Sequence, residues 1–249
     1  MVILLTTGVT GYVGRAVLYQ LLRLVKEESS STSTASTQRL KILLLVRAKR
    51  NVSVEDRIGS LRSQPMFSDL QEQWKEITEI VETGDMTLVN CGMVKDTVQK
   101  LKQANVAHIV HCTGDVTFDR PLDLLAAANI TASLQLQSMA RKWSTFQRMV
   151  YVSTAFVNPN SGNESTPNPE SLVDLNGVDP VEVYQSMMGD QIFATTVKES
   201  MRFQNNDVFS KCIAEHLLSR HETKQLWIAR PAVVGPSWVV PAPGWNGDS

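Results

Sequence analysis

Short apolar runs recur along the chain, and each has the length of a buried strand. The runs lie at residues 2–5, 40–46, 77–82, 108–112, 148–152 and 227–231. Between them lie longer segments in which apolar residues repeat at the 3.6-residue period of an amphipathic helix. After the first run, for example, Val13, Val17 and Leu21 fall on one helical face. Strands that alternate with helices predict an α/β fold with a parallel sheet.

The other segments complete a one-domain plan. Helical patterns cover residues 57–74, 94–101, 122–140 and 207–219. Residues 27–37 are rich in Ser and Thr, which is typical of a surface loop. Residues 158–206 are too long for a simple connection, so we interpret them as a partly helical insertion on the substrate side. We therefore expect residues 1–249 to form a single domain.

The first apolar run leads into a turn with a glycine at every third position. The first glycine allows a tight turn, the second lets a phosphate approach the backbone, and the third lets the helix pack closely. Backbone N–H groups at the start of the next helix then face a pyrophosphate. The predicted cofactor residues of this turn are Gly8, Thr10, Gly11, Tyr12, Val13 and Gly14. The glycine turn and the alternation of strands with helices together predict a Rossmann-like, doubly wound parallel sheet of six or more strands, with helices on both faces.

The end of the second run bears on the choice of cofactor. Arg47, Lys49 and Arg50 follow it, and no acidic residue does. An acidic side chain there usually holds the ribose 2′-hydroxyl of NAD, whereas cations suit the 2′-phosphate of NADP. We therefore predict NADPH as the cofactor and Arg47 as a ligand of its 2′-phosphate. The alternative for Arg47 is an ordinary solvated arginine.

Two further strand ends carry candidate cofactor residues. Asp85 and its neighbour Met86 follow the third run, where the carboxylate can accept a hydrogen bond from the adenine amino group. Thr113 and Gly114 follow the fourth run, and such small residues let the backbone lie close to a bound cofactor. The sequence therefore predicts one nucleotide site that spans the ends of several strands.

Composition narrows the range of partners. The formal net charge is −1 with interspersed signs, which leaves no basic surface for nucleic acid. No apolar run approaches the ~18 residues of a membrane span, so no transmembrane segment is predicted. His108 and His111 lack nearby metal-ligand partners, and we interpret them as buried, hydrogen-bonded residues with no metal site. Three cysteines without a Cys-x-x-Cys pair suggest free thiols in a reducing compartment, on a cytoplasmic face or in soluble form, with the organelle left open.

Seven motifs together resemble a known family. They are Thr7-Gly8-x-x-Gly11-x-x-Gly14, Leu45-Val46-Arg47-Ala48-Lys49, Gly84-Asp85, His111-Cys112 before Val116-x-Phe118-Asp119, Val152-Ser153-Thr154-Ala155-x-Val157-Asn158, Ser210-Lys211-x-x-Ala214-Glu215 and Arg230-Pro231-x-Val233-x-Gly235-Pro236-Ser237-Trp238. In this order they resemble the NADPH-binding domain of fatty acyl-CoA reductases, the male-sterility type of extended short-chain dehydrogenase/reductase. Thioester reductase domains of carboxylic acid reductases and peptide synthetases have a similar outline. The closing Pro-Ser-Trp and the later Pro-Gly-Trp favour the acyl-CoA enzymes.

The resemblance implies hydride transfer from NADPH to a long-chain acyl-CoA thioester, which gives an aldehyde and then an alcohol. It also implies that Thr154, with Ser153 in reserve, donates to the developing oxyanion, and that Asn129 supports a proton-relay water. Lys211 would tune the proton source and hold the ribose. The resemblance places the last cofactor contacts at Arg230, Pro231 and Val233.

One position departs from the family pattern. The family has a tyrosine four residues before the lysine, and here that position is Asp207. With Lys211 one helical turn away, we expect Asp207 to stay ionised and unable to donate a proton at neutral pH. Tyr184, in the insertion over residues 158–206, is a remote candidate to replace the missing tyrosine. Family members also continue past the Pro-Gly-Trp into a C-terminal domain, which we interpret as absent from this chain.

Two other hypotheses, in which the protein does not reduce an acyl-CoA, stay open. The first is a non-catalytic NADPH-binding protein of the same fold, acting as a sensor or scaffold. The second is a nucleotide-sugar epimerase, which shares the glycine turn but also needs the tyrosine. An assay of NADPH oxidation with a long-chain acyl-CoA, together with a measurement of cofactor binding, separates these readings.

Overall fold

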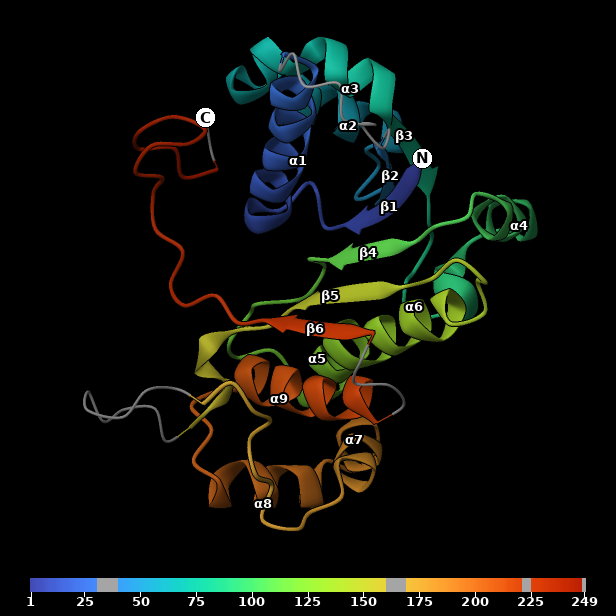
Figure 1. Ribbon diagram of the computed structural model, residues 1–249. Helices are drawn as coiled ribbons and strands as arrows, with labels where there is room; N and C mark the ends of the chain where they lie inside the picture. The colour runs from blue at the N-terminus through green and yellow to red at the C-terminus, as the bar shows by residue number, and fades with distance from the viewer. Residues whose placement is uncertain (31–39, 160–168, 221–224, 248–249) are drawn as a thin grey trace.

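Six parallel strands form one sheet in the computed structural model, which describes residues 1–30, 40–159, 169–220 and 225–247. The order across the sheet is β3-β2-β1-β4-β5-β6 (Figure 1). The strands are β1 (Val2–Thr7), β2 (Leu40–Val46), β3 (Thr78–Glu82), β4 (His108–His111), β5 (Arg148–Val152) and β6 (Leu226–Ala229). The order reverses between β1 and β4, and ligands of open α/β sheets bind at the carboxyl ends of the strands beside such a reversal. The predicted Rossmann-like fold is confirmed.

The central strands are mostly apolar because helices cover both faces of the sheet, whereas the edge strand β3 leaves Glu79, Ile80 and Glu82 exposed. On β1, Leu4 packs into one buried cluster while Ile3 and Leu5 pack into the other. One face is covered by α1 (Tyr12–Ser30), α2 (Val54–Arg62), the 3₁₀ turn η1 (Pro65–Leu70) and α3 (Gln71–Ile77). The other is covered by η2 (Val89–Gly92), α4 (Lys95–Gln103), α5 (Leu122–Leu125), the π-helix η3 (Ala126–Thr131), α6 (Ala132–Ala140) and α9 (Asn206–Ser219).

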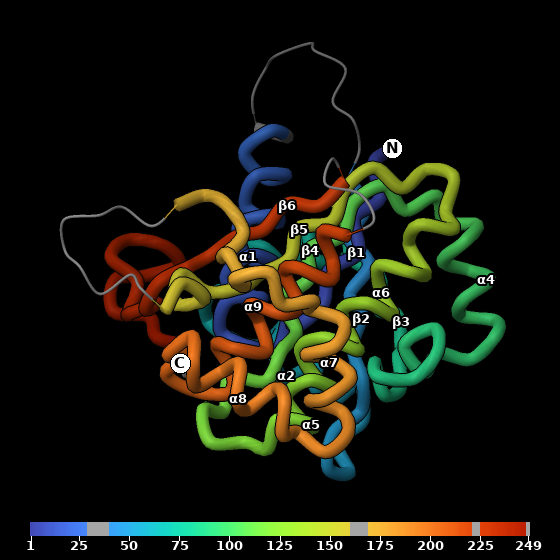
Figure 2. The backbone as a smooth tube through the Cα atoms, turned by 90° about the horizontal axis from the view of Figure 1, so that it is seen from below, coloured from blue at the N-terminus to red at the C-terminus, as the bar shows by residue number. Residues whose placement is uncertain are grey.

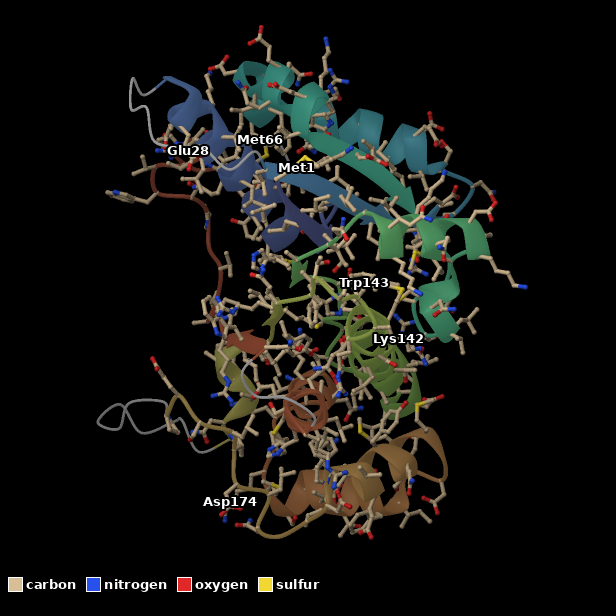
Figure 3. The ribbon with its side chains drawn as sticks, turned by 45° about the vertical axis from the view of Figure 1, so that its right-hand side comes forward. Met1, Glu28, Met66, Lys142, Trp143 and Asp174 are labelled. Atoms are coloured by element: carbon tan, nitrogen blue, oxygen red, sulfur yellow. The ribbon has the colours of Figure 1, made fainter. Side chains whose placement is uncertain are left out.

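The insertion forms an outer layer on the second face. Its helices α7 (Pro180–Met188) and α8 (Ile192–Ser200) lie beyond α9, as the view from below shows (Figure 2). Figure 3 shows α9 nearly end-on between the sheet and this layer. The layer is held by Val183 and Met187, which are fully buried in the main cluster. Residues 169–206 contain these two helices, so the insertion is partly helical there, while residues 160–168 lie outside the described chain. Its position on the substrate side stays a prediction.

Several sequence-based boundaries differ from the structure. The helix expected over residues 57–74 is divided into α2, η1 and α3. The first helix continues to Ser30, past the point where we expected a loop, and in this part Arg23 and Glu27 form an exposed ion pair at 2.6 Å one turn apart. Residues 31–37 of that expected loop lie outside the described chain. Ile77 ends α3 and β3 begins at Thr78. The long helix over 122–140 contains a π-helical stretch, which periodicity does not reveal.

Within the described ranges, no helix is both long and apolar enough to cross a membrane. The same ranges hold no cluster of three or more His, Cys, Asp or Glu side chains that could bind a metal. The three cysteines are free thiols, with Cys91 and Cys212 buried and Cys112 half-buried.

Candidate cofactor and catalytic site

The glycine turn between β1 and α1 is shaped by close backbone packing. Gly8 has φ +73°, and a Cβ there would lie 2.7 Å from the Cys112 carbonyl group on the end of β4. A Cβ on Gly14 would lie 2.2 Å from Gly8 O, so this glycine lets α1 pack against the turn itself. A Cβ on Gly11 would meet only Gly8 O, at 3.3 Å. The Gly11 backbone is therefore open on its other side.

A pocket of about 290 Å³ adjoins this turn. Its walls are residues 8–11 of the turn, 45–47 at the end of β2, 83 and 86 after β3, and 112–114 after β4. Arg47, Lys49 and Arg57 line it, and none of its lining residues is an acid. Three cations beside an open glycine backbone suit a ligand with several phosphates. The predicted positions of Arg47, Met86, Thr113 and Gly114 thus meet at one pocket.

Arg57 is a pocket residue that sequence reasoning missed. Its guanidinium donates to Thr10 Oγ1 at 2.7 Å and to the Arg47 carbonyl oxygen. Burial and the charge of Arg47 lower the pKa of Arg57, and a bound anion would oppose both effects. One sequence signal marks the start of this helix: Ser53 caps α2 by accepting from Asp56 N at 3.0 Å. That cap sets Arg57 in the first turn, beside the end of β2.

Asp85 follows β3 with an exposed carboxylate. Its Oδ1 accepts hydrogen bonds from both Thr87 N and Thr87 Oγ1 at 2.9 Å, and these bonds lower the pKa of the Asp85 carboxyl. The neighbouring Met86 is 8% exposed and forms part of the pocket wall. Asp85 itself is not part of that wall, so its contact with adenine stays a prediction.

Asn129 is the centre of a buried polar cluster next to the pocket. Its Oδ1 accepts from Asp115 N at 2.7 Å, and its Nδ2 donates to Asp115 O at 3.0 Å and to Ser210 Oγ at 2.9 Å. Nδ2 also lies 3.2 Å from Asp207 Oδ1. A Cβ on Gly114 would lie 3.0 Å from Asn129 Oδ1. The π-helix that carries Asn129 therefore ties α9 to the loop after β4, which forms part of the pocket wall.

Lys211 and Asp207 lie one turn apart on α9, and both are almost fully buried, at 7% and 5% exposure. Lys211 Nζ would be 3.5 Å from a Cβ on Gly114, so the ammonium points to the pocket side of the cluster. Burial lowers the pKa of Lys211, while Asp207, Glu215 and Cys112 oppose that shift. Burial also raises the pKa of Asp207, and this effect outweighs the charge of Lys211. Desolvation is therefore the larger of the two effects, and our expectation that Asp207 stays ionised at neutral pH remains a prediction.

A second polar chain links the glycine turn to the π-helix through His111. Thr113 N donates to Thr7 Oγ1 at 3.3 Å, and Thr7 Oγ1 lies 2.8 Å from His111 Nδ1. On the other side, His111 Nε2 lies 3.0 Å from Ser133 Oγ, which donates to Asn129 O at 2.7 Å. The proton of Ser133 Oγ is donated to Asn129 O, so this oxygen accepts from His111 Nε2, whereas Thr7 Oγ1 donates to His111 Nδ1. The ring proton of His111 is therefore on Nε2. His111 is fully buried and hydrogen-bonded, as predicted, and burial lowers the pKa of His111 to about 3. The sequence also predicts a buried His108, but at the start of β4 this residue is only half-buried.

The two hydroxyls after β5 have different environments. Thr154 is half-buried and caps the short turn η4 (Ala155–Val157) by accepting from Phe156 N at 3.3 Å, which leaves its own proton free to donate. Ser153 is 4% exposed, and its Oγ has no hydrogen-bond partner in the described part of the chain. An unpartnered buried hydroxyl is costly in an apolar setting. Both hydroxyls therefore retain donor capacity at the carboxyl edge of the sheet.

None of the four tyrosines takes the position beside Lys211. Tyr184, the remote substitute, has its hydroxyl 2.7 Å from Thr131 Oγ1. Tyr12 donates to Gly235 O at 2.7 Å, and its ring stacks on Trp245 at 4.9 Å. Tyr151 is 1% exposed inside the core, and the fourth, on α1, packs against a phenylalanine of η1.

The closing motif holds the end of the chain against α1. Arg15 donates to Gly247 O, and the segment with Trp245 lies beside α1 (Figure 1).

The side chain of Arg230 forms a two-bonded ion pair with Glu215, with Nε–Oε1 3.0 Å and Nη2–Oε2 2.5 Å. Pro231 O accepts from Ala155 N at 2.9 Å, and Val233 is 83% exposed. Arg230 thus has a structural partner, and cofactor contacts at 230, 231 and 233 stay predictions.

Comparison with known proteins agrees with the resemblance. The family model described as "Male sterility protein", for an NAD-binding domain, matches residues 6–249. The chain is 27% identical over 247 residues to fatty acyl-CoA reductase 1 of Xenopus laevis, which covers 97% of this chain and 45% of that protein. For the Gallus gallus fatty acyl-CoA reductase 1 the identity is 28%, with the same coverage. The terminal reductase domain of the myxalamid pathway shares the fold, with TM-score 0.70 and 21% identity over 100% of this chain and 52% of that domain. The chain therefore spans about half the length of these relatives.

Proposed function

The chain belongs to the male sterility protein family of NAD-binding domains, and from that premise we propose that it takes part in NADPH-dependent reduction of a long-chain acyl-CoA. The thioester is reduced to an aldehyde and then to a fatty alcohol. Curated relatives that match over 97% of this chain are named fatty acyl-CoA reductases. The site geometry supports the proposal through two features that meet at Gly114: an anion pocket and a polar catalytic cluster.

The residues of the anion pocket fit NADPH. The open backbone at Gly11 faces the pyrophosphate, and Arg47 with Arg57 binds the 2′-phosphate. When bound, NADPH supplies the hydride. Lys211 holds the ribose hydroxyls, because its ammonium lies beside Gly114, a residue of the pocket wall.

The carbonyl oxygen of the substrate is held from the carboxyl edge of the sheet. Thr154 donates its free hydroxyl proton to that oxygen, with Ser153 as the second donor. Asn129 holds the cluster in place and supports a relay water through its amide. The observation that carries the proposal is Lys211, a nearly buried ammonium whose nitrogen lies beside Gly114, a residue of the pocket wall.

The test is a spectrophotometric assay of NADPH oxidation with a long-chain acyl-CoA. The amount of bound cofactor is measured in the same sample. Turnover with release of free CoA supports the proposal. Cofactor binding without oxidation favours the rival proposal of a non-catalytic NADPH-binding protein. Asp207 is the observation behind that rival, because it occupies the position of the family's tyrosine.

Cofactor choice gives a separate prediction. NADPH should bind more tightly than NADH. Arg47→Ala or Arg57→Ala should weaken the binding of NADPH and leave the binding of NADH unchanged. A hydrogen bond to a charged group contributes about 1.5–3 kcal/mol, which is roughly 10–150-fold in Kd. NADH titrated against the same variants is the control, because it lacks the 2′-phosphate. Equal affinity of the wild-type protein for both cofactors would refute the assignment.

A further inference from the structure

Reduction of a carbonyl needs a proton for the oxygen, and the described site offers few sources. Three of the four tyrosine hydroxyls have other settings: Tyr12 and Tyr184 bond to Gly235 O and Thr131 Oγ1, and Tyr151 is buried in the core. Tyr19 packs against Phe67 in the buried cluster on the other face of the sheet. His111 is neutral and enclosed between two hydroxyls. Near Gly114, the Asp115 carboxylate is paired with Arg120, and burial raises the pKa of the Cys112 thiol to about 11. The remaining acidic groups there are those of Asp207 and Lys211.

Lys211 is the better placed of the two. It is 7% exposed, and its ammonium has no hydrogen-bond or ion-pair partner among the residues that the structure describes. A charged donor that is nine-tenths buried and unpartnered needs a ligand to complete it. Its nitrogen points to Gly114, at the wall of the cofactor pocket. The substrate oxygen is a ligand that meets this need.

Asp207 has a different role in the cluster. Its Oδ1 lies 3.2 Å from Asn129 Nδ2, so the carboxyl group acts as an acceptor. It also lies in the first turn of α9, where the helix favours a negative charge. The groups that face Lys211 are Asp207 and Glu215 on its own helix and Cys112 and His111 at the end of β4. Because Glu215 is paired with Arg230, Asp207 is the carboxylate left to balance the lysine.

We propose that Lys211 itself donates the proton to the substrate oxygen, and that Asp207 is the positioning residue that keeps this ammonium charged. The inference rests on the proposed function. When the thioester carbonyl carbon accepts a hydride, the C=O π pair moves to oxygen. The oxygen then takes a proton from Nζ: an O–H bond forms, an N–H bond breaks, and a neutral amine remains. When the resulting hemithioacetal breaks down, the amine takes the hydroxyl proton back, the carbonyl re-forms and the CoA thiolate leaves.

Lys211→Arg separates proton donation from cofactor binding. Arginine keeps the positive charge and the N–H donors but cannot release a proton, because its pKa lies far above neutral pH. We expect NADPH affinity to be retained and kcat to fall by about 10²–10⁴-fold, the usual contribution of a positioned acid. A Lys211→Arg protein that melts like wild type and keeps its kcat overturns the proposal. A loss of NADPH affinity with unchanged kcat also overturns it, because Lys211 would then only hold the cofactor.

Asp207→Asn tests the positioning role. The amide keeps the acceptor for Asn129 but removes the charge that offsets the burial of Lys211. We expect the high-pH limb of the kcat profile to move to lower pH, with activity retained on the acid side. Loss of activity at every pH, with no movement of the limb, would make Asp207 the proton donor and overturn the proposal.

A titration without turnover completes the test. The side chain of Lys211 is followed by carbon-13 NMR in lysine-labelled protein, with the signal assigned from the Lys211→Arg variant and the exposed Lys75 as reference. Lys211 should titrate below its ordinary ~10.4 and lower still in Asp207→Asn. An ordinary titration that Asp207→Asn does not change overturns the proposal. A protein that binds NADPH but oxidises it with no acyl-CoA refutes the proposed function, and the NMR titration still decides whether Lys211 is a proton donor tuned by Asp207.

Discussion

Arg230 offers the sharpest separation between a structural and a cofactor-binding role. Its guanidinium pairs through two bonds with Glu215, whose side chain is fully buried, and it also donates to Pro169 O at 3.2 Å. The pair joins α9 to the end of β6. Arg230→Met removes the cation and leaves the Glu215 carboxylate without a partner in an apolar environment, which is the costly way to break a buried pair.

The size of the effect follows from burial. Removing one partner of a buried ion pair costs about 3–5 kcal/mol. Because the Arg230 side chain keeps 18% exposure, we expect the lower end, about 3 kcal/mol of unfolding free energy. For a chain of this size each kcal/mol lowers Tm by roughly 2–4 °C, so Tm should fall by about 6–12 °C. The NADPH affinity of the folded fraction should not change.

Thermal melts and NADPH titration on the same protein check this prediction. Glu215→Gln with Arg230→Met is the matched control, because it removes the buried charge as well and should recover much of the lost Tm. The reasoning is refuted if Arg230→Met melts like the wild-type protein while its NADPH affinity drops. Arg230 would then be a cofactor ligand, as the family resemblance implies.

Three further predictions concern the turn, the cluster and the buried histidine. Gly11→Val should abolish NADPH binding with little change in Tm. Gly14→Ala should lower both the NADPH affinity and Tm, because its Cβ would meet Gly8 O at 2.2 Å. Thermal melts with parallel NADPH titrations distinguish the two variants, and normal binding by Gly11→Val contradicts the phosphate assignment. In the Lys211→Arg background, which lacks the proposed donor, Asp207→Tyr should recover acyl-CoA-dependent NADPH oxidation by up to ~10²–10⁴-fold, since a phenol one helical turn away is a positioned acid; a double variant that binds NADPH yet stays inert with every acyl-CoA contradicts it. Burial lowers the pKa of His111 from 6.5 to about 3, so the unfolded chain binds more protons between these values. Stability should therefore fall as the pH drops from about 6.5 towards 3, and His111→Gln should flatten that part of a denaturation profile measured against pH; an unchanged slope would mean that His111 is charged in the folded protein.

Local sequence determined the framework of this protein. Apolar runs too short for helices, with amphipathic segments between them, identify the strands because the central strands are buried on both faces. The turn at Gly8 is also a local feature, since a positive φ and close packing at successive turns require glycine. The basic cluster after β2 and the departure at Asp207 are visible in the sequence for the same reason: each depends on position along the chain.

Tertiary structure decided which of these residues meet. Arg57 joins the pocket only because a capped helix returns it to the end of β2, and Arg230 is held by Glu215 fifteen positions earlier in the chain. The burial that outweighs the charge of Lys211 at Asp207 comes from packing by the π-helix and the loop after β4. Hydrogen bonds between distant segments and the desolvation of charges depend on the packed chain as a whole, so no local pattern encodes them.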